Sequence, residues 1–445
     1  MFKKIIVNKF GGGILAKKYI PLIEKRLRQQ IKTGYAPIAV VSALPGITDE
    51  LLLFSKKREL AGQSIKLFIS RLFKKHLKIM AEIGVSDKWF NQAKIEWEEI
   101  LRGLEKDLNI VRHSGLTNIL EDKIAAYGEK MSVIFLAGLL NDKGLSAEKF
   151  FAEEIPVITD DNFKNAGIKY QIYEKNIRKK LPVLNELPVI AGFTGKTAKG
   201  QTTVLGRGGT DTTACFLAAA LRADKVILWK DVGGVLSADP KIVPEAKTIP
   251  YISYQEAEES GKVIQEKAIQ YVKMFNTPLE IVSLTKPENK TKVGAATRKK
   301  SGAKIVSFKR NLTLFIINEE KIKMNDLLSM ACQIFAKHKV EIILISNARY
   351  ILQIVADNEN GLVDKVFKEL KNKVAAIKAF KVNMVFLVGS FNVNDVNDFN
   401  NLLIKHKTGL EISAFLYENC ARIEAIIKSD KIENIIRVLY KKFIK

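Results

Sequence analysis

The sequence contains little cysteine and histidine, which limits the chemistry it can carry. Its 445 residues include only three cysteines and four histidines. Cys215, Cys332 and Cys420 lie far apart and are odd in number, which fits a reducing cytoplasm and matches no metal-ligand spacing. The sequence therefore predicts a cytoplasmic protein with no metal site built from its own side chains.

Long apolar runs are also missing. No stretch reaches the roughly eighteen apolar residues of a membrane helix, so we expect no membrane span. Residues 1–7 begin like a signal peptide, but the apolar run stops at Asn8 without a cleavage site, and we interpret it as a buried strand. The 47% of hydrophobic residues and the length predict a soluble protein of two or three domains.

Negatively charged residues are relatively few: the chain has 48 acidic and 72 basic residues, which gives a formal charge of +24. The lysines are spread through the chain and do not alternate with aromatic residues, as they would in a single-strand binder. We therefore predict a lysine-rich surface and no nucleic-acid partner. The positive field would raise the local concentration of small anions.

The first part of the chain predicts a three-layer α/β domain with a mainly parallel sheet. Residues 5–10 and 36–42 are near-continuous apolar runs, typical of strands covered on both faces, and 20–31 between them has helical spacing. Residues 50–140 are expected to be almost wholly helical. Further expected elements are the strands 183–191 and 225–229 and the helix 212–221.

The last part of the chain has a different pattern. Residues 286–304 are polar, contain proline and glycine, and indicate a linker. A β-α-β-β-α order then occurs twice, which predicts two ferredoxin-like α+β units. The expected elements are strands 312–318, 340–346, 350–356, 384–388, 410–416 and 421–427 and helices 326–337, 362–370, 396–406 and 431–440.

Two glycine-rich segments are candidates for binding anions. Lys9 ends the first strand and is followed by Gly11-Gly12-Gly13, whose amides can approach a phosphate, although such a segment is often only a tight turn. Gly206-Arg207-Gly208-Gly209-Thr210-Asp211 precedes a helix, whose N-terminus can bind an anion. Arg207 offers a planar fork for a carboxylate, and Asp211 is either functional or an N-cap.

A third segment follows the expected strand 225–229. Asp231 and Asp239 come after this strand, where ligands of open α/β sheets bind, so both are candidates for nucleotide contact or for pinning a loop. Asp239-Pro240 is equally compatible with a simple turn.

These segments resemble the aspartate kinase branch of the amino-acid kinase family. The matching stretches, in chain order, are Lys9–Gly12, Ser42–Thr48, Gly128–Ser132, Gly192–Gly195, Thr202–Asp211 and Asp231–Pro240. The repeat at the end resembles the paired ACT domains of the same family, so the resemblance covers nearly the whole chain.

The resemblance implies a domain division and an activity. It implies a catalytic domain at 1–300, ACT-like domains at 308–381 and 382–445, and a homodimer or larger assembly through the ACT units. The implied reaction moves the γ-phosphoryl of MgATP to the side-chain carboxylate of L-aspartate, the first step towards lysine, threonine and methionine. That carboxylate is ionised at pH 7, so no general base is expected, and Mg²⁺ would be held mainly by phosphate oxygens and water.

The resemblance also implies roles for individual residues. Lys9 and Asp211 would be catalytic, with Lys9 stabilising the transferring phosphoryl group and Asp211 organising the lysines around it. Arg207 would pair with the α-carboxylate of aspartate and Glu129 with its amine. The implied aspartate site is Ser42, Ala43, Thr48, Glu129, Phe193, Arg207, Gly208 and Thr210. The implied ATP site is Lys9, Gly11, Gly12, Lys230, Asp231, Leu236, Lys241 and Lys262.

Some positions depart from the family pattern. Gly13-Ile14 replaces a Thr-Ser pair, Lys230 replaces a hydroxyl residue, and the segment around Lys262 is shortened. No convincing lysine or threonine pocket is evident at Asn325-Asp326, so we expect weak or no inhibition by either amino acid. Two alternatives stay open: a kinase of the same fold acting on another acid such as glutamate, and a non-catalytic amino-acid sensor.

Overall fold

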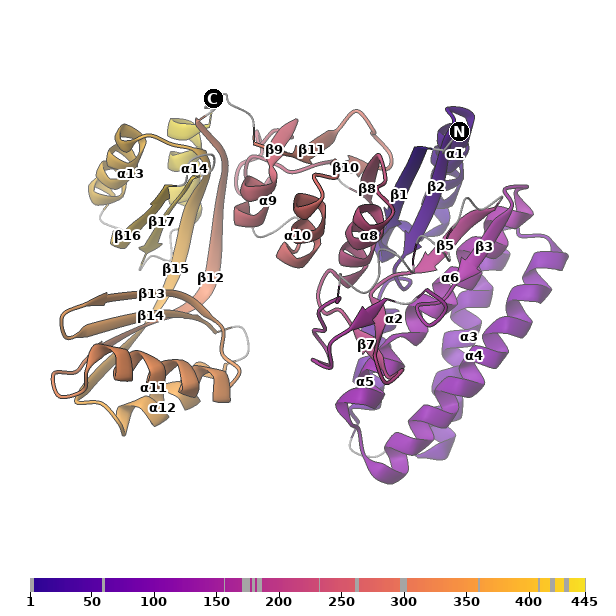
Figure 1. The fold of residues 1–445 in the computed structure, drawn as a ribbon, viewed down its shortest axis with the longest axis horizontal. Helices are drawn as coiled ribbons and strands as arrows, with labels where there is room; N and C mark the ends of the chain where they lie inside the picture. The colour runs from indigo at the N-terminus through magenta and orange to yellow at the C-terminus, as the bar shows by residue number, and fades with distance from the viewer. Residues whose placement is uncertain are drawn as a thin grey trace. The chain divides into compact units, whose positions relative to one another are not determined.

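The computed structural model contains two compact units (Figure 1). It describes residues 4–57, 61–155, 157–169, 177, 181, 186–231, 233–260, 264–296, 302–358, 361–406, 409–416, 421–427 and 432–444. The first unit comprises residues up to Val235 together with Thr248–Ala296. Leu236–Lys247 packs with the second unit, which otherwise runs from Thr297 to the C-terminus, so the chain leaves the first unit and returns to it before residue 300.

The first unit is built on an eight-stranded sheet in the order β3-β5-β2-β1-β8-β10-β11-β9. All its neighbouring strands are parallel except β10 and β11. The strands are β1 (Lys4–Phe10), β2 (Tyr35–Val41), β3 (Ala147–Phe150), β5 (Leu187–Ala191), β8 (Lys225–Lys230), β9 (Tyr251–Ser253), β10 (Leu279–Ser283) and β11 (Lys290–Gly294). Because the central strands are covered on both faces, most of their residues are apolar, although β1 also buries Asn8 and Lys9.

Helices cover both faces of this sheet, as the three-layer expectation requires. Their bounds are α1 (Ile20–Lys32), α2 (Ile47–Ser55), α3 (Gly62–Ile83), α4 (Asp87–Ser114), α5 (Asn118–Ala125), α6 (Tyr127–Asp142), α8 (Gly209–Ala220), α9 (Tyr254–Ser260) and α10 (Glu266–Met274). Ile6 and Phe10 of β1 join the core formed with α1 and α3–α6. Side chains alternate along a strand, so Lys9 points to the opposite face, where α8 packs.

A small sheet in the order β4-β6-β7 lies in the same unit and contributes to the site described below. Its strands are β4 (Ile158–Thr159), β6 (Thr194–Thr197) and β7 (Thr202–Val204). The predicted strand 183–191 starts at Leu187 as β5; residues 183–185 lie outside the described part of the chain.

The predicted linker 286–304 is wrong over part of its length. β11 pairs with β10 and β9, and β12 begins at Gly302. Thr291 and Val293 are buried while the residues beside them are not, so this short strand alternates and shows no continuous apolar run.

The second unit has one six-stranded antiparallel sheet in the order β13-β14-β12-β15-β17-β16, not two separate sheets. Its strands are β12 (Gly302–Asn318), β13 (Ile342–Ala348), β14 (Ile351–Asp357), β15 (Ala376–Ser390), β16 (Gly409–Leu416) and β17 (Ala421–Ile427), and its helices are α11 (Met324–Lys337), α12 (Val363–Lys371), α13 (Val393–Lys405) and α14 (Ile432–Phe443).

The long strands β12 and β15 run through both repeats. Residues 312–318 pair with 376–382, whereas 302–309 pair with 384–390, with a β-bulge between the two halves of β12. One core lies under α11 and α12 and the other under α13 and α14. The strand 302–309 thus belongs to the second repeat. The predicted start of the first ACT-like domain, at residue 308, lies inside this strand. No helix in the described ranges is long and apolar enough to cross a membrane.

Candidate active site

Two lysines from neighbouring strands share one buried carboxylate. Lys9 is the last residue but one of β1 and Lys230 is the last of β8. These strands are parallel neighbours, so both side chains reach the same edge of the sheet. The Lys9 Nζ lies 2.6 Å from Asp211 Oδ1, and the Lys230 Nζ lies 3.2 Å from Asp211 Oδ2. Asp211 is not the N-cap of α8, which is Gly208, so capping does not explain it.

Burial and charge act against each other in this cluster. Burial raises the pKa of Asp211, but Lys9 and Lys230 outweigh it, and the pKa falls below its ordinary value. Burial lowers the pKa of Lys9, and the Asp211 carboxylate opposes this shift. The result is an ionised carboxylate holding two ammonium groups, an arrangement that can offset negative charge on a transferring phosphoryl group.

The glycine segment after β1 packs tightly against the end of β2. Gly12 opens a 3-10 turn, Gly12–Ile14, and a Cβ at Gly12 would clash with the carbonyl oxygen of Ala43. A Cβ on Gly11 would lie 3.2 Å from the Lys9 Nζ. Gly11 therefore leaves space beside the lysine, as a phosphate-binding backbone requires, and Gly12 lets the turn pack on Ala43.

Glu129 is a buried carboxyl group with one oxygen free. It lies in the first turn of α6 and is 2% exposed. The Ala43 N–H donates to Glu129 Oε1 at 3.1 Å, while Oε2 has no hydrogen-bond partner among the residues that the structure describes. Burial raises the pKa of Glu129 to about 8. An uncompensated buried carboxyl group is costly, so this oxygen is suited to an incoming cation.

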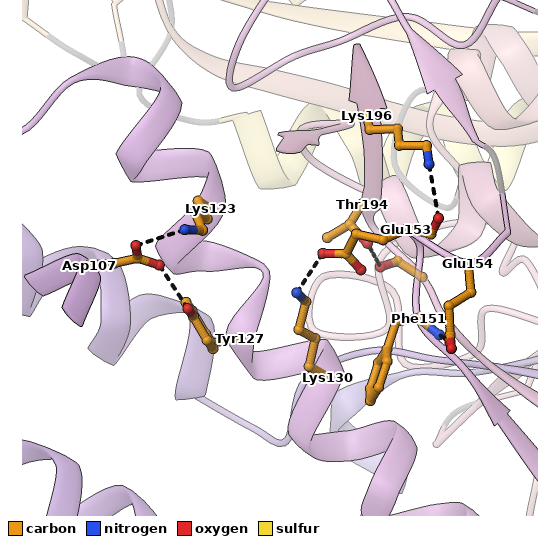
Figure 2. Close-up of polar contacts among 10 residues, drawn as sticks. Asp107, Lys123, Tyr127, Lys130, Phe151, Glu153, Glu154, Thr194 and Lys196 are labelled. Atoms are coloured by element: carbon orange, nitrogen blue, oxygen red, sulfur yellow. Dashed lines mark hydrogen bonds and ion pairs between the residues drawn. The ribbon is translucent and has the colours of Figure 1, made fainter. Parts of the chain in front are cut away.

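The start of α6, which carries Glu129, is held by polar contacts on both sides (Figure 2). The Tyr127 hydroxyl donates to Asp107 Oδ2 at 2.7 Å, and Lys130 pairs with Glu153 at 2.5 Å. Asp107 also pairs with Lys123 at 2.8 Å. These contacts fix the helix turn on which Glu129 sits.

A cavity of about 490 Å³ brings most of the predicted aspartate site together. It is lined by Lys9, Ser42, Thr48, Leu52, Glu121, Asp122, Ala125, Glu129, Lys164, Phe193, Val204, Gly206, Arg207, Gly208, Gly209 and Thr210. Ala43 is absent from this wall but holds Glu129 through its N–H. The cavity thus combines Arg207, two lysines and three carboxyl groups, and among the carboxyl groups Glu129 has an oxygen suited to a cation.

Two glycines with positive φ shape the loop that carries Arg207, and a strained residue lies in the cavity wall. Phe193, at the cavity wall, has φ of +68°, and its N–H donates to the Thr213 hydroxyl at 3.1 Å. Gly208, beside Arg207, has φ of +71°, and a Cβ there would clash with Gln265. Non-glycine residues in the left-handed region concentrate at functional sites because the surrounding structure must hold them there.

Of the predicted ATP residues, Lys9 and Lys230 meet at Asp211, and Gly11 and Gly12 follow Lys9 in the chain. Asp231 is exposed on the strand end beside Lys230. Leu236 and Lys241 belong to the segment that packs with the second unit, and Lys262 lies outside the described residues. Asp239 accepts from the Lys241 N–H at 3.0 Å, as in a turn. The ATP assignments stay predictions.

Sequence reasoning missed eight lining residues: Leu52, Glu121, Asp122, Ala125, Lys164, Val204, Gly206 and Gly209. Gly206 and Gly209 belong to the Gly206–Asp211 segment, which the sequence predicts to bind an anion without assigning these two glycines to the aspartate site. Glu121 and Asp122 fall inside a long helical region, and nothing in their local pattern indicates that they face a cavity.

The sequence matches the model of the amino acid kinase family over residues 4–283. The chain therefore belongs to the amino acid kinase family.

Among curated relatives, it is 26% identical over 470 aligned positions to the chloroplastic aspartokinase 3 of Arabidopsis thaliana, covering 99% of this chain and 82% of that protein. It is 28% identical to the lysine-sensitive aspartokinase 3 of Escherichia coli, covering 80% of this chain and 78% of that protein.

Solved structures have the same fold. The E. coli aspartokinase III complex with aspartate and ADP aligns with a TM-score of 0.81 at 22% identity, covering 98% of this chain and 99% of that one. The Clostridium acetobutylicum aspartate kinase aligns with a TM-score of 0.74 at 23% identity, covering 98% and 99%.

Proposed function

We propose that the chain is an aspartate kinase, which transfers the γ-phosphoryl group of ATP to the side-chain carboxylate of L-aspartate. One observation carries the proposal: the free oxygen of buried Glu129 shares a cavity with Arg207 and Lys9. An α-amino acid with an acidic side chain offers an ammonium and two carboxylates, which match these three groups. The aspartokinase relatives support the same activity.

The substrate would be held at its α-carbon. Arg207 offers a bidentate fork for the α-carboxylate, and Glu129 accepts from the ammonium. The side-chain carboxylate then extends towards Lys9. Ser42, Thr48, Phe193 and Thr210 complete the wall and set the length of acid that fits.

The reaction needs charge compensation and alignment, not a general base. An oxygen of the ionised side-chain carboxylate attacks the γ-phosphorus, a new O–P bond forms, and the bond to the β–γ bridging oxygen breaks, releasing ADP. Lys9 and Lys230, organised by Asp211, offset the charge of the transferring group, and Gly11 and Gly12 leave room for it.

Mg²⁺ would neutralise phosphate charge during transfer. No group of three acidic, histidine or cysteine side chains arranged for a metal exists in the described part of the chain, so the ion would be held mainly by phosphate oxygens and water.

The test is an ADP-release assay with L-aspartate, L-glutamate and D-aspartate, with the acyl phosphate trapped by hydroxylamine. We expect ADP and hydroxamate in equal amounts with L-aspartate only. Faster turnover of L-glutamate would favour the other-acid kinase. Tight aspartate binding without ADP release, under conditions where ATP binds, would favour the sensor.

We also infer a homodimer formed through the second unit, in the cytoplasm. The edge strands β13 and β16 each have one unpaired side within the sheet, and edge pairing would close a two-fold assembly. Cys215 and Cys332 are free thiols, which suits a reducing compartment. Light scattering at micromolar concentration should give twice the 49.9 kDa chain mass, and a monomer would contradict the inference.

A further inference from the structure

Lys164 is held at the rim of the substrate cavity in an unusual backbone conformation. Its φ is +72°, in the region that glycine favours. Its N–H donates to both oxygens of the Asp122 carboxylate, at 3.1 and 3.0 Å. Asp122 is 1% exposed and also accepts from the Val204 N–H at 2.9 Å. The Asp122 carboxylate therefore holds the Lys164 backbone in this conformation and links it to Val204 of the small sheet.

Lys164 and Arg207 are both among the residues that line the cavity. A Cβ on Gly206 would lie 3.1 Å from the Lys164 carbonyl oxygen, so the Lys164 backbone packs against the loop that carries Arg207. A non-glycine residue with positive φ costs of order 1 kcal/mol, and a surface lysine has no structural need for it.

The Lys164 ammonium shares its ion-pair partner with a second lysine. Its Nζ lies 2.6 Å from Glu121 Oε2, but Lys56 lies 2.7 Å from Glu121 Oε1, so one carboxylate serves two ammonium groups. Burial raises the pKa of Glu121, but the two lysines outweigh it and the pKa is lowered, so Glu121 is ionised. Two ammonium groups thus share the Glu121 carboxylate at the cavity rim, while Asp122 holds the Lys164 backbone.

We propose that Lys164 is a substrate-binding residue, which contacts the α-carboxylate of the amino acid together with Arg207 and is positioned by Asp122 and Glu121. The proposal rests on the proposed function and adds a specificity determinant to it. A carboxylate held by both cations would be distinguished from an amide or ester at the same position, because neither replacement carries charge.

The experiment compares Lys164→Ala and Lys164→Gly with Lys56→Ala. Lys56 is the matched control, since it shares Glu121 but does not line the cavity. We expect both Lys164 variants to raise the KM for aspartate roughly fivefold to tenfold, with kcat and the KM for ATP nearly unchanged, as for one partly exposed charged contact. Lys56→Ala should leave all three constants near the wild-type values.

Two further readouts separate charge from structure. Glycine relieves the φ strain that alanine keeps, so Lys164→Gly should be the more stable variant in urea while showing the same rise in KM. With L-isoasparagine, which has an amide in place of the α-carboxylate, the difference between wild type and the Lys164 variants should vanish. If that difference persists, or if Lys56→Ala raises the KM equally, the proposal is wrong.

Failure of the proposed function gives a different result. If wild type shows no aspartate-dependent ADP release, or Arg207→Lys leaves aspartate saturation unchanged, the substrate site itself is misassigned. If wild type releases ADP with aspartate and Arg207→Lys weakens aspartate saturation, the substrate site is correct. If both Lys164 variants then have the wild-type KM for aspartate, only the role of Lys164 is wrong. A rise in the KM for ATP instead would also overturn it.

Discussion

The free oxygen of Glu129 predicts that aspartate binding releases a proton. The pKa of Glu129 is raised to about 8 because the group is fully buried. At pH 7 only about 9% of empty molecules would carry the carboxylate that accepts the substrate ammonium. If binding requires this form, the apparent affinity at pH 7 is weakened about elevenfold, which is about 1.4 kcal/mol.

The pH dependence follows from the same shift. Between pH 6 and about 7.5 the apparent Kd for aspartate should fall nearly tenfold per pH unit, and it should level off above pH 8. Calorimetry in buffers of different ionisation enthalpy should report about 0.9 protons released per aspartate at pH 7. The aspartate ammonium stays charged in this range and does not mask the effect.

Glu129→Gln is the control. It cannot ionise, so it should bind aspartate weakly at every pH and release no proton. A wild-type Kd that is flat from pH 6 to 8, with no proton release, would refute the assignment of Glu129 to the ammonium. The same pKa shift affects stability. Between pH 4.5 and about 8, Glu129 is protonated in the empty folded protein but ionised in the unfolded chain. Its contribution therefore lowers the free energy of unfolding as pH rises through this range.

Three other predictions test the site and the core. Lys9→Ala should lower kcat by at least about a hundredfold while the circular dichroism spectrum stays native, because the charge offset on the phosphoryl group is lost; near-normal kcat would exclude the role. Arg207→Lys should raise the KM for aspartate about tenfold or more, since a point charge cannot replace a fork; an unchanged KM would place Arg207 outside the substrate site. His76 is fully buried against Trp97, and its Nε2 has no hydrogen-bond partner among the described residues. Burial lowers its pKa from 6.5 to about 4. The free energy of unfolding should therefore fall by about 3 kcal/mol as pH decreases from 6.5 to 4. Urea titrations should show that His76→Leu flattens this slope, and an identical slope in the variant would show that another group titrates.

The fold of the first unit could be predicted because its signals are local. The apolar runs at β1, β2 and β8 and the helical spacing of α1 each lie within one element. β11 could not be predicted, since a five-residue strand with two buried side chains resembles a polar loop until its neighbours are known.

The site residues also include some that the sequence could predict and some that it could not. Lys9, Glu129, Arg207 and Asp211 belong to motifs, so a sequence pattern indicates them. The resemblance also implies that Asp211 organises neighbouring lysines. The contact between Asp122 and Lys164, in contrast, joins residues far apart in the chain and follows only from the fold. The roles assigned to all of these residues stay predictions until the variants are measured.

The shared sheet of the second unit means that its two repeats are not separable modules. The second repeat starts at residue 302, before the first, and is completed after it. A chain cut after residue 381 would keep strand 302–309 but lose its partner 384–390, leaving a long unpaired edge prone to association. We therefore expect the two repeats to unfold in one thermal transition, and deletion of either repeat to unfold the other.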